Sequence, residues 1–362
     1  MTIAAVALSC GLSALVLVMA LVLPSAASRT VPFGVRVPAQ RADDPAVAGQ
    51  TRLYRWRVLG GGIVVAAVSA AIYGLTGETL LLPLSVLMLV GVWYGCFSLA
   101  HHEIRAAKAA GGWYDDLRQG IAVDTGLRTD PPRFPWLWLT PAVIVIVATA
   151  VIGVLSYPSM PAILAVHYSA NGVPNRLAAK SVATAFSLVF VQIGVTALLV
   201  GIAAAIFFRS RPDIDPARPV GSARWHRHYM SLGAKALLGL AAMIDVGMLG
   251  SSLLMWTGTV TRWASLVVVI PILAGVTVAI VVLARNSRQR DDGEPDTGLT
   301  HRDDDKYWRG GLLYVNRDDH ALMVPRRFGI GWTLNFGNPR TAMLLAGLAA
   351  LIALLITLRL AG

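Results

Sequence analysis

The chain has 362 residues, of which 56% are hydrophobic and only 14% are charged, and its formal net charge is +11. This composition excludes an ordinary soluble protein of the same length. In a membrane protein, a positive balance is explained by Lys and Arg in cytoplasmic loops, so we expect no direct binding of nucleic acid. Cys10 and Cys96, the two cysteines, both fall in apolar stretches, which excludes a disulfide framework.

Long apolar segments follow one another along the whole chain. A helix needs about 20 predominantly apolar residues to cross the bilayer core. Stretches such as 58–77 and 181–208 contain no Asp, Glu, Lys or Arg. The sequence therefore predicts an all-α integral membrane protein with an eight-helix transmembrane bundle. Its spans are expected near 3–23, 58–76, 79–99, 136–156, 182–207, 235–256, 263–284 and 341–360.

The first span could be confused with a signal peptide, because small residues that resemble a cleavage site follow it. A signal peptide begins with basic residues, however, and Met1 to Ile3 has none. We interpret 3–23 as a retained helix whose N-terminus lies outside the cell.

The distribution of positive charge predicts the orientation of the bundle. Of the 31 Lys and Arg residues, 26 fall in alternate loops, namely 24–57, 100–135, 208–234 and 285–340. Basic loops stay on the cytoplasmic side of a membrane. Both termini and the central loop 157–181 are therefore expected outside.

The chain divides at its longer polar loops into regions of different character. We expect an N-terminal three-helix region 1–135, a helix–loop–helix unit 136–207, a helical hairpin 208–284, a linker 285–302, a small cytoplasmic segment 303–340 and a last transmembrane helix 341–362.

The segment 303–340 has its own predicted structure. Leu312–Val315 and Ala321–Val324 are strand-like, and the residues between them have a turn composition. This pattern predicts a β-hairpin. About 38 residues bury too little surface to fold alone, so we expect the hairpin to pack on the cytoplasmic face of the bundle or on a partner.

Histidine pairs occur beside two spans, at His101-His102 and in Trp225-His226-Arg227-His228. A helical zinc site of the H-E-x-x-H type needs histidines at i and i+4 on one face. Adjacent histidines on a helix point in different directions and chelate poorly. We interpret both pairs as interfacial polar residues and expect no metal site.

The central loop 157–181 concentrates prolines, a turn signal and hydrogen-bonding side chains. Pro158, Pro161 and Pro174 end helices and stiffen the loop, and Asn-Gly favours a turn with positive φ. Two interpretations stay open: a hydrogen-bonded lid over the helix ends, or a ligand-recognition surface. The candidate recognition residues are His167, Tyr168, Asn171, Gly172, Asn175 and Arg176.

Asp245 is the one acidic residue inside a predicted span. Intramembrane acids are costly and mark either a functional site or a polar contact between helices. Gln192, in another span, is a conceivable hydrogen-bond partner. A structural interhelical bond is the favoured interpretation, and a place in a transport path is the alternative.

The central loop resembles a domain of unknown function in SdpI-type bacterial membrane proteins. The residues that carry this resemblance are Pro158-x-Met160-Pro161, Val166-His167-Tyr168, Asn171-Gly172-x-Pro174-Asn175-Arg176 and Lys180. The chain departs from the family pattern at Ala165, where Pro is usual, and at Asn175, where Asp is usual. The resemblance implies a multi-pass protein of the bacterial cytoplasmic (inner) membrane.

Residues 303–339 contain Tyr307-Trp308, Gly311, Tyr314-x-Asn316, Asp318-Asp319, Val324-Pro325-Arg326-Arg327 and Gly331-Trp332-Thr333-Leu334-Asn335. Through these residues the segment resembles a second uncharacterised domain that often accompanies the first. We expect contacts with a cytoplasmic partner from conspicuous residues of this segment. They are Trp308, Tyr314, Asn316, Asp318, Arg326, Arg327, Trp332 and Asn335.

SdpI-like members give immunity to a secreted peptide toxin and relay its presence to a cytoplasmic repressor. By this resemblance we expect a non-enzymatic protein that senses or blocks an envelope-active peptide outside and signals to a regulator inside. The alternative is a transporter of a small solute with Asp245 in its path. The sequence shows no catalytic pair, so we expect no enzyme activity and no cofactor. The lipid bilayer is the first expected partner.

Overall fold

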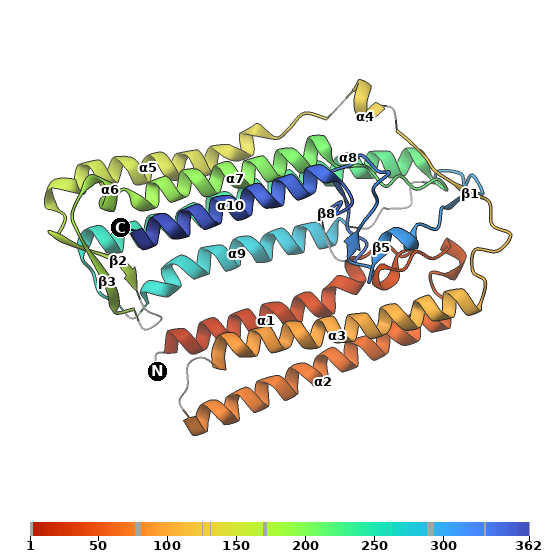
Figure 1. Ribbon diagram of the computed structural model, residues 1–362, viewed down its shortest axis with the longest axis horizontal. Coiled ribbons are helices and arrows are strands. Elements are labelled where there is room, and N and C mark those ends of the chain that lie inside the picture. Colours follow the sequence, from red (N-terminus) through yellow and green to blue (C-terminus); the bar gives the residue numbers. More distant parts are fainter. Residues whose placement is uncertain are drawn as a thin grey trace.

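The structure is a computed structural model, and Figure 1 shows it as a long bundle of helices with small strands at both ends. It describes residues 3–76, 81–124, 126–130, 132–168, 172–261, 263–287, 293–328 and 331–361. The chain is mostly helical, as predicted.

Long helices dominate the described chain. They are α1 (Ile3–Ala26), α2 (Pro45–Thr76), α3 (Leu81–Ala110), α5 (Thr140–Ser156), α7 (Ser187–Arg209), α8 (Pro219–Thr257), α9 (Ala264–Arg285) and α10 (Pro339–Ala361). Short helices α4 (Gly126–Thr129) and α6 (Val182–Ala185) lie in the connections.

Six of these helices are, within the described residues, long and apolar enough to cross a membrane: α2, α3, α5, α7, α8 and α9. A shorter apolar stretch, Cys10–Ser25, lies within α1. Six predicted spans therefore have a matching helix by this measure, while the total of eight stays a prediction. The clearest difference is α8, which begins at Pro219 although its span was predicted from residue 235. The charged residues before residue 235 interrupt the apolar pattern, but they belong to the same continuous helix.

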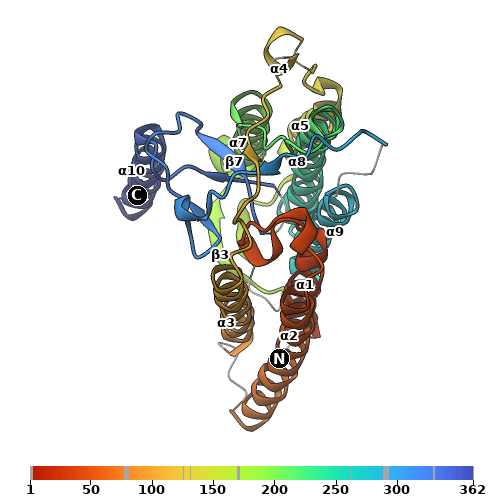
Figure 2. The same cartoon turned by 90° about the vertical axis from the view of Figure 1, so that its right-hand side faces the viewer.

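The helices form two groups. In the first, α3 packs against both α1 and α2, and in the second, α8 packs against α5, α7 and α9. Contact between α1 and α9 joins the groups. Figure 2 looks onto one end of the bundle and shows α10 standing to one side of the other helices.

The close packing of α8 on α9 depends on small residues. A Cβ added at Gly247 of α8 would lie 2.8 Å from the carbonyl oxygen of Val268 in α9. Small residues allow helices in a membrane to approach closely enough for dense van der Waals contact. This contact fixes α8 against its neighbour.

One end of the bundle carries a β-hairpin. Strands β2 (Ile163–Tyr168) and β3 (Pro174–Ala179) pair in antiparallel fashion, and both chain ends lie near the same end of the bundle (Figure 1). The hairpin was not predicted as strands, although Gly172 has the expected positive φ of 78°. Its strands escaped detection because they are short and interrupted by register shifts between Ala165 and Tyr168.

The opposite end carries the segment that we call the cap, residues 300–338. Strand β5 (Trp308–Arg309) pairs with β6 (Leu313–Tyr314), and β7 (Met323–Pro325) pairs with β8 (Trp332–Leu334). The predicted pairing of Leu312–Val315 with Ala321–Val324 is therefore wrong. Gly310 and Gly311, both with positive φ, turn the chain back immediately after β5, so β6 pairs with the preceding strand.

The predicted linker 285–302 is docked where the structure describes it. Glu294 accepts hydrogen bonds from the backbone N–H groups of Val220 and Gly221, at 2.9 and 2.7 Å, at the start of α8. Strand β4 (Thr300–His301) pairs in parallel with β1 (Gln119–Gly120). A carboxylate that satisfies free amides at a helix N-terminus is stabilising, so these residues are held rather than loose.

An aromatic core joins the cap to the first helix group. Phe328 of the cap lies 4.4 Å from Phe97 of α3 and 5.7 Å from Phe33, measured between ring centroids. Gly34 and Gly311 bring their backbones together, since a Cβ at Gly34 would lie 2.6 Å from the carbonyl oxygen of Gly311. The cap is thus packed on the end of the bundle, as expected for a segment too small to fold alone.

Candidate functional site

The hairpin β2–β3 brings two of the predicted recognition residues together. The Nδ1 of His167 donates a hydrogen bond to the Oδ1 of Asn175 over 2.6 Å, and both residues are exposed. Arg176 pairs in register with His167 and is also exposed. Tyr168 is half-buried, and burial raises the pKa of its phenol. Asn171 lies outside the described residues.

The base of the hairpin is anchored on the end of α8. Leu164 is fully buried and packs in one cluster with Met160, Met255 and Trp256. The indole N–H of Trp256 donates to the carbonyl oxygen of Ala185 over 2.8 Å. Lys180 donates to the carbonyl oxygen of Met160 over 3.1 Å. One face of the hairpin is therefore fixed to the bundle, and the polar face with His167 remains open to solvent.

A polar cluster lies inside the second helix group and includes the predicted pair of Gln192 and Asp245. Gln192 Nε2 donates to the backbone oxygen of Asp245 over 2.9 Å and to Thr149 Oγ1 over 3.1 Å. Thr196 Oγ1 donates to Asp245 Oδ2 over 2.8 Å. The sequence suggested Gln192 but missed both threonines, which are inconspicuous in apolar helices. The cluster links α5, α7 and α8 through polar side chains.

The cap is fixed to the bundle by a network of ion pairs, which we call the arginine clamp. Arg36 binds Asp213 through Nη2 over 2.8 Å and Asp304 through Nε over 2.7 Å. Arg327 of the cap binds Asp304 and Asp305. Lys108 of α3 binds Asp305 over 2.6 Å and Asp303 over 2.8 Å.

The two arginines of the clamp are largely shielded from solvent. The side chains of Arg36 and Arg327 are only 5% and 2% exposed, so each needs its carboxylate partners. Burial opposes ionisation of Asp305, but Arg327 and Lys108 outweigh that effect and hold its pKa below the usual range. Burial likewise opposes the charge of Arg36, yet Asp213 and Asp304 raise its pKa. Arg36 and Asp305 are therefore held in their charged forms by their partners in the clamp.

Several residues predicted to contact a partner build the interior of the cap. Asn335 is fully buried, and its Nδ2 donates to the carbonyl oxygens of Asn316 and Asp319, each over 2.9 Å. Tyr314, 1% exposed, donates to Asp319 Oδ2 over 2.9 Å. Trp308 and Arg327 are also buried. These four side chains have structural contacts, whereas Asp318 and Arg326 are exposed.

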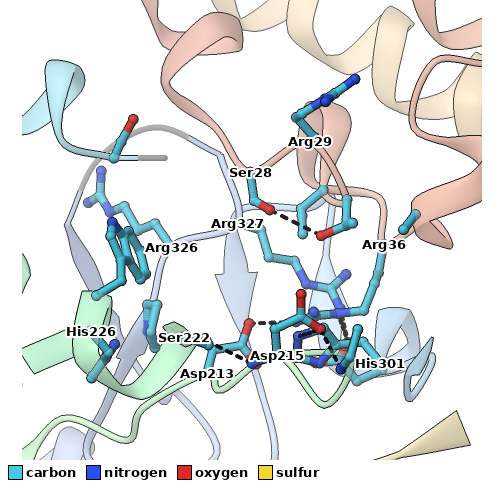
Figure 3. Close-up of a pocket in the computed structure, with 18 of the residues that line it drawn as sticks. Ser28, Arg29, Arg36, Asp213, Asp215, Ser222, His226, His301, Arg326 and Arg327 are labelled. Atoms are coloured by element: carbon cyan, nitrogen blue, oxygen red, sulfur yellow. Dashed lines mark hydrogen bonds and ion pairs between the residues drawn. The ribbon is translucent and has the colours of Figure 1, made fainter. Parts of the chain in front are cut away.

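A cavity of about 620 Å³ lies between the cap, the start of α8 and the loop after α1. Figure 3 shows Arg326 and His226 on one side and Arg36, Asp213 and His301 on the other. Trp332 of the cap and Tyr229 of α8 also line it, with ring centroids 5.7 Å apart. The sequence alone indicates His226 only as an interfacial residue and gives no local sign of Arg36 or Asp213.

Within the part of the chain that the structure describes, no three His, Cys, Asp or Glu residues are arranged so that they could hold an ion. His101 lies 2.9 Å from the carbonyl oxygen of Phe33 through Nδ1, which gives it a role in packing.

Two parts of the chain match known families. Residues 144–193 match a domain of unknown function (DUF1648), a family typical of multi-pass membrane proteins, and residues 317–341 match a family of unknown function (DUF5808). A search of curated proteins and a search of solved structures each found no match. The first match covers α5, the hairpin β2–β3 and the start of α7, and the second covers the C-terminal part of the cap. The chain is thus a membrane protein that contains two uncharacterised domains.

Proposed function

We propose that the protein is a non-enzymatic sensor of the SdpI-like type in the bacterial cytoplasmic membrane. The hairpin β2–β3 binds an envelope-active peptide outside, and the cap passes the signal to a cytoplasmic regulator, which gives immunity or a response to the peptide. The observation that carries this proposal is the continuity of α8.

Helix α8 has direct contacts with both ends of the protein. At its C-terminal end, Trp256 packs on Leu164 of the hairpin, and near its start, Tyr229 packs on Trp332 of the cap. Its 39 residues make a single rod of about 58 Å at 1.5 Å per residue. A displacement at the hairpin is therefore transmitted to the cap by one continuous element, and Asp245 ties that element to α7 midway.

The surface of the hairpin indicates the chemistry of the peptide. Ile163 and Leu177 are each 61% exposed, and Arg176 is an exposed cation without a carboxylate partner among the described residues. Such a surface suits an apolar peptide that carries a carboxylate, since Arg binds that group with two parallel hydrogen bonds.

The experiment places one fluorophore on the cap. A cysteine at Asp318, in a chain without Cys10 and Cys96, is labelled and the protein is reconstituted in nanodiscs. A synthetic amphipathic peptide with a free C-terminal carboxylate is titrated in, alongside the same peptide with an amide. The carboxylate form should change the fluorescence, and Arg176→Gln should abolish the change.

A pair of neighbouring variants tests the path through α8. Leu164→Ala removes a fully buried contact with α8, whereas Ile163→Ala changes a largely exposed side chain of the same strand. We expect Leu164→Ala to weaken the cap response while peptide binding persists, and Ile163→Ala to leave the cap response intact. Peptide binding without any signal from the cap in the wild type would overturn the sensor proposal.

Transport of a small solute is the second candidate, because Asp245 Oδ1 and Gln192 Oε1 are buried and have no hydrogen-bond partner among the described residues. A solute or proton in the membrane could satisfy both acceptors. Flux of a solute that depends on Asp245 would favour this function over sensing.

A further inference from the structure

The cavity beside the cap has acidic residues in its wall, but each of them already has a partner. Asp43 binds Arg29 over 2.5 Å and Asp213 binds Arg36 over 2.8 Å. Asp304 is held by the two arginines of the clamp. Two further acids accept backbone N–H groups: Asp215 from Ala217 over 3.0 Å and Asp296 from Gly298 over 2.8 Å. The acids of the wall are thus engaged in local structure.

Several hydrogen-bond donors in the same wall have no partner among the described residues. Among the described residues that line the cavity, the buried nitrogen atoms without a hydrogen-bond partner are Trp308 Nε1, Trp332 Nε1, Arg327 Nε and His226 Nε2. The indole and guanidinium nitrogens can only donate, and His226 Nε2 donates when it carries a proton. A buried donor without a partner is destabilising, so donors gathered around a cavity indicate an acceptor within it.

Arg326 adds a positive charge to this side of the cavity. Its Nε donates to the backbone carbonyl oxygen of Trp332 over 3.1 Å, which holds the guanidinium near the backbone of that residue. No carboxylate of the described chain lies within ion-pair distance of it. His226, which Figure 3 shows on the same side, is 2% exposed and is therefore shielded from bulk water.

We propose that this cavity binds a phosphate group, carried by a soluble phosphate ester or by a lipid headgroup, on the side formed by Arg326, Trp332 and His226. A phosphate has several acceptor oxygens that face different directions. It can therefore accept hydrogen bonds from Trp332 of the cap and from His226 of α8 at the same time. Arginine is well suited to it because its planar donors bind phosphate oxygens in pairs. The cavity, about 620 Å³, is large enough for a headgroup or a small phosphate ester.

This site goes beyond the sensor function and would exist without it. It lies where the cap meets α8, so a bound phosphate would bridge the two through Trp332 and His226. Occupancy of the cavity is then expected to stabilise the cap against the bundle.

The test uses purified full-length protein in a maltoside detergent, after removal of lipid. Inorganic phosphate and phosphatidylglycerol in mixed micelles are titrated separately, with sodium chloride at equal ionic strength as the reference. The measurements are the melting temperature and the tryptophan fluorescence, to which Trp225, Trp308 and Trp332 of the wall contribute among ten tryptophans. We expect at least one of the two probes to raise the melting temperature and to change the fluorescence.

Three variants separate the site from general charge effects. Trp332→Phe keeps an aromatic ring and removes the N–H, and Arg326→Gln removes the charge of an exposed side chain. Each should weaken the apparent affinity by about tenfold, as expected for the loss of one charge-assisted or buried hydrogen bond. Arg317→Gln, an exposed arginine of the cap that does not line the cavity, is the matched control and should bind like the wild type.

The outcomes are distinct. A response to inorganic phosphate without one to phosphatidylglycerol identifies a soluble phosphate compound as the source, and a response to phosphatidylglycerol identifies a lipid headgroup; both support the site. No response beyond that of sodium chloride would overturn it. Equal affinity in the wild type, Trp332→Phe and Arg326→Gln would overturn it as well. Because Arg326 is exposed, its variant is expected to fold even if Trp332→Phe lowers the yield. If the protein shows no response to peptide but still binds phosphate, the sensor proposal is wrong and the phosphate site stands. The two proposals can therefore be tested independently.

Discussion

Arg327 donates a hydrogen bond to the carbonyl oxygen of Gly34 over 3.1 Å, although 293 positions separate the two residues in the chain. The same guanidinium binds Asp304 and Asp305, so one side chain joins the loop after α1 to the interior of the cap. The attachment of the cap therefore depends on a few buried charges.

The first prediction concerns Arg327→Gln. Loss of the guanidinium removes one partner from Asp304 and one from Asp305. Breaking a buried ion pair costs about 3–5 kcal/mol. The melting temperature in detergent should fall clearly. Arg317→Gln, an exposed change in the same cap, should stay within about 0.5 kcal/mol of the wild type. Equal melting temperatures for the two variants would show that the clamp does not hold the cap.

The second prediction is a loss of stability on acidification. Burial lowers the pKa of His301, so below about pH 6.5 the unfolded chain takes up a proton more readily and the folded state loses stability. The lowered pKa of Asp305 also makes the folded state less stable on acidification, but at lower pH. The stability that ionised Asp305 contributes is present above about pH 4 and is lost as the pH falls through the pKa of the folded state.

Melting temperatures between about pH 8 and pH 3 would check this, because that range includes the ordinary pKa values of both His and Asp. His301→Gln should reduce the decline in the upper part of the range, and Asp305→Asn should reduce it in the lower part. A melting temperature that rises on acidification would contradict the assignment.

The third prediction separates structure from transport at Asp245. Asp245→Asn keeps an oxygen that can accept from Thr196, so membrane abundance and melting temperature should change little. Asp245→Leu removes that acceptor and should cost about 1–3 kcal/mol. Solute flux measured in vesicles that contain equal amounts of protein is the deciding readout. Flux that is present in the wild type and absent in Asp245→Asn would establish the transporter alternative.

The fourth prediction concerns the hairpin. His167 is exposed, so His167→Ala should cost no more than about 0.5 kcal/mol and should weaken the response to peptide. Gly172→Val is the control for the turn, because a β-branched residue resists the φ of 78° found there. A large fall in the melting temperature of His167→Ala, with function lost in proportion to protein amount, would favour a structural lid instead.

The fifth prediction is the orientation in the membrane. In a chain without Cys10 and Cys96, a cysteine at Leu177 should react with an impermeant thiol reagent in intact cells, and one at Asp318 should not. Both positions are exposed, so burial does not explain a difference between them. Labelling of the cap but not of the hairpin would reverse the proposed topology.

The helices could be predicted well because hydropathy is a local property. Each of the eight predicted spans overlaps a long helix, and Asp245 does contact Gln192. The start of α8 was misplaced because Arg224 and Arg227 interrupt the apolar pattern in its first turns, while the backbone stays helical.

The contacts of the cap could not be predicted in the same way. The three consecutive aspartates 303–305 were visible in the sequence, but nothing local indicates that Arg36 and Lys108 are their partners. The predicted role of Trp308 and Tyr314 as surface residues also followed from conspicuous chemistry alone, whereas packing places them inside. Pairing between distant residues depends on the whole fold.

The separation between Arg36 and the aspartates of the cap has a consequence for synthesis. Arg36 leaves the ribosome 268 residues before Asp304 does, and domains form as their contacts become available. Until then, the N-terminal helices carry an arginine and the rings of Phe33 and Phe97 without their final cover. A chain that lacks the cap would leave these groups without that cover. Docking of the cap therefore completes the core around the loop after α1 only once the last part of the chain has been made.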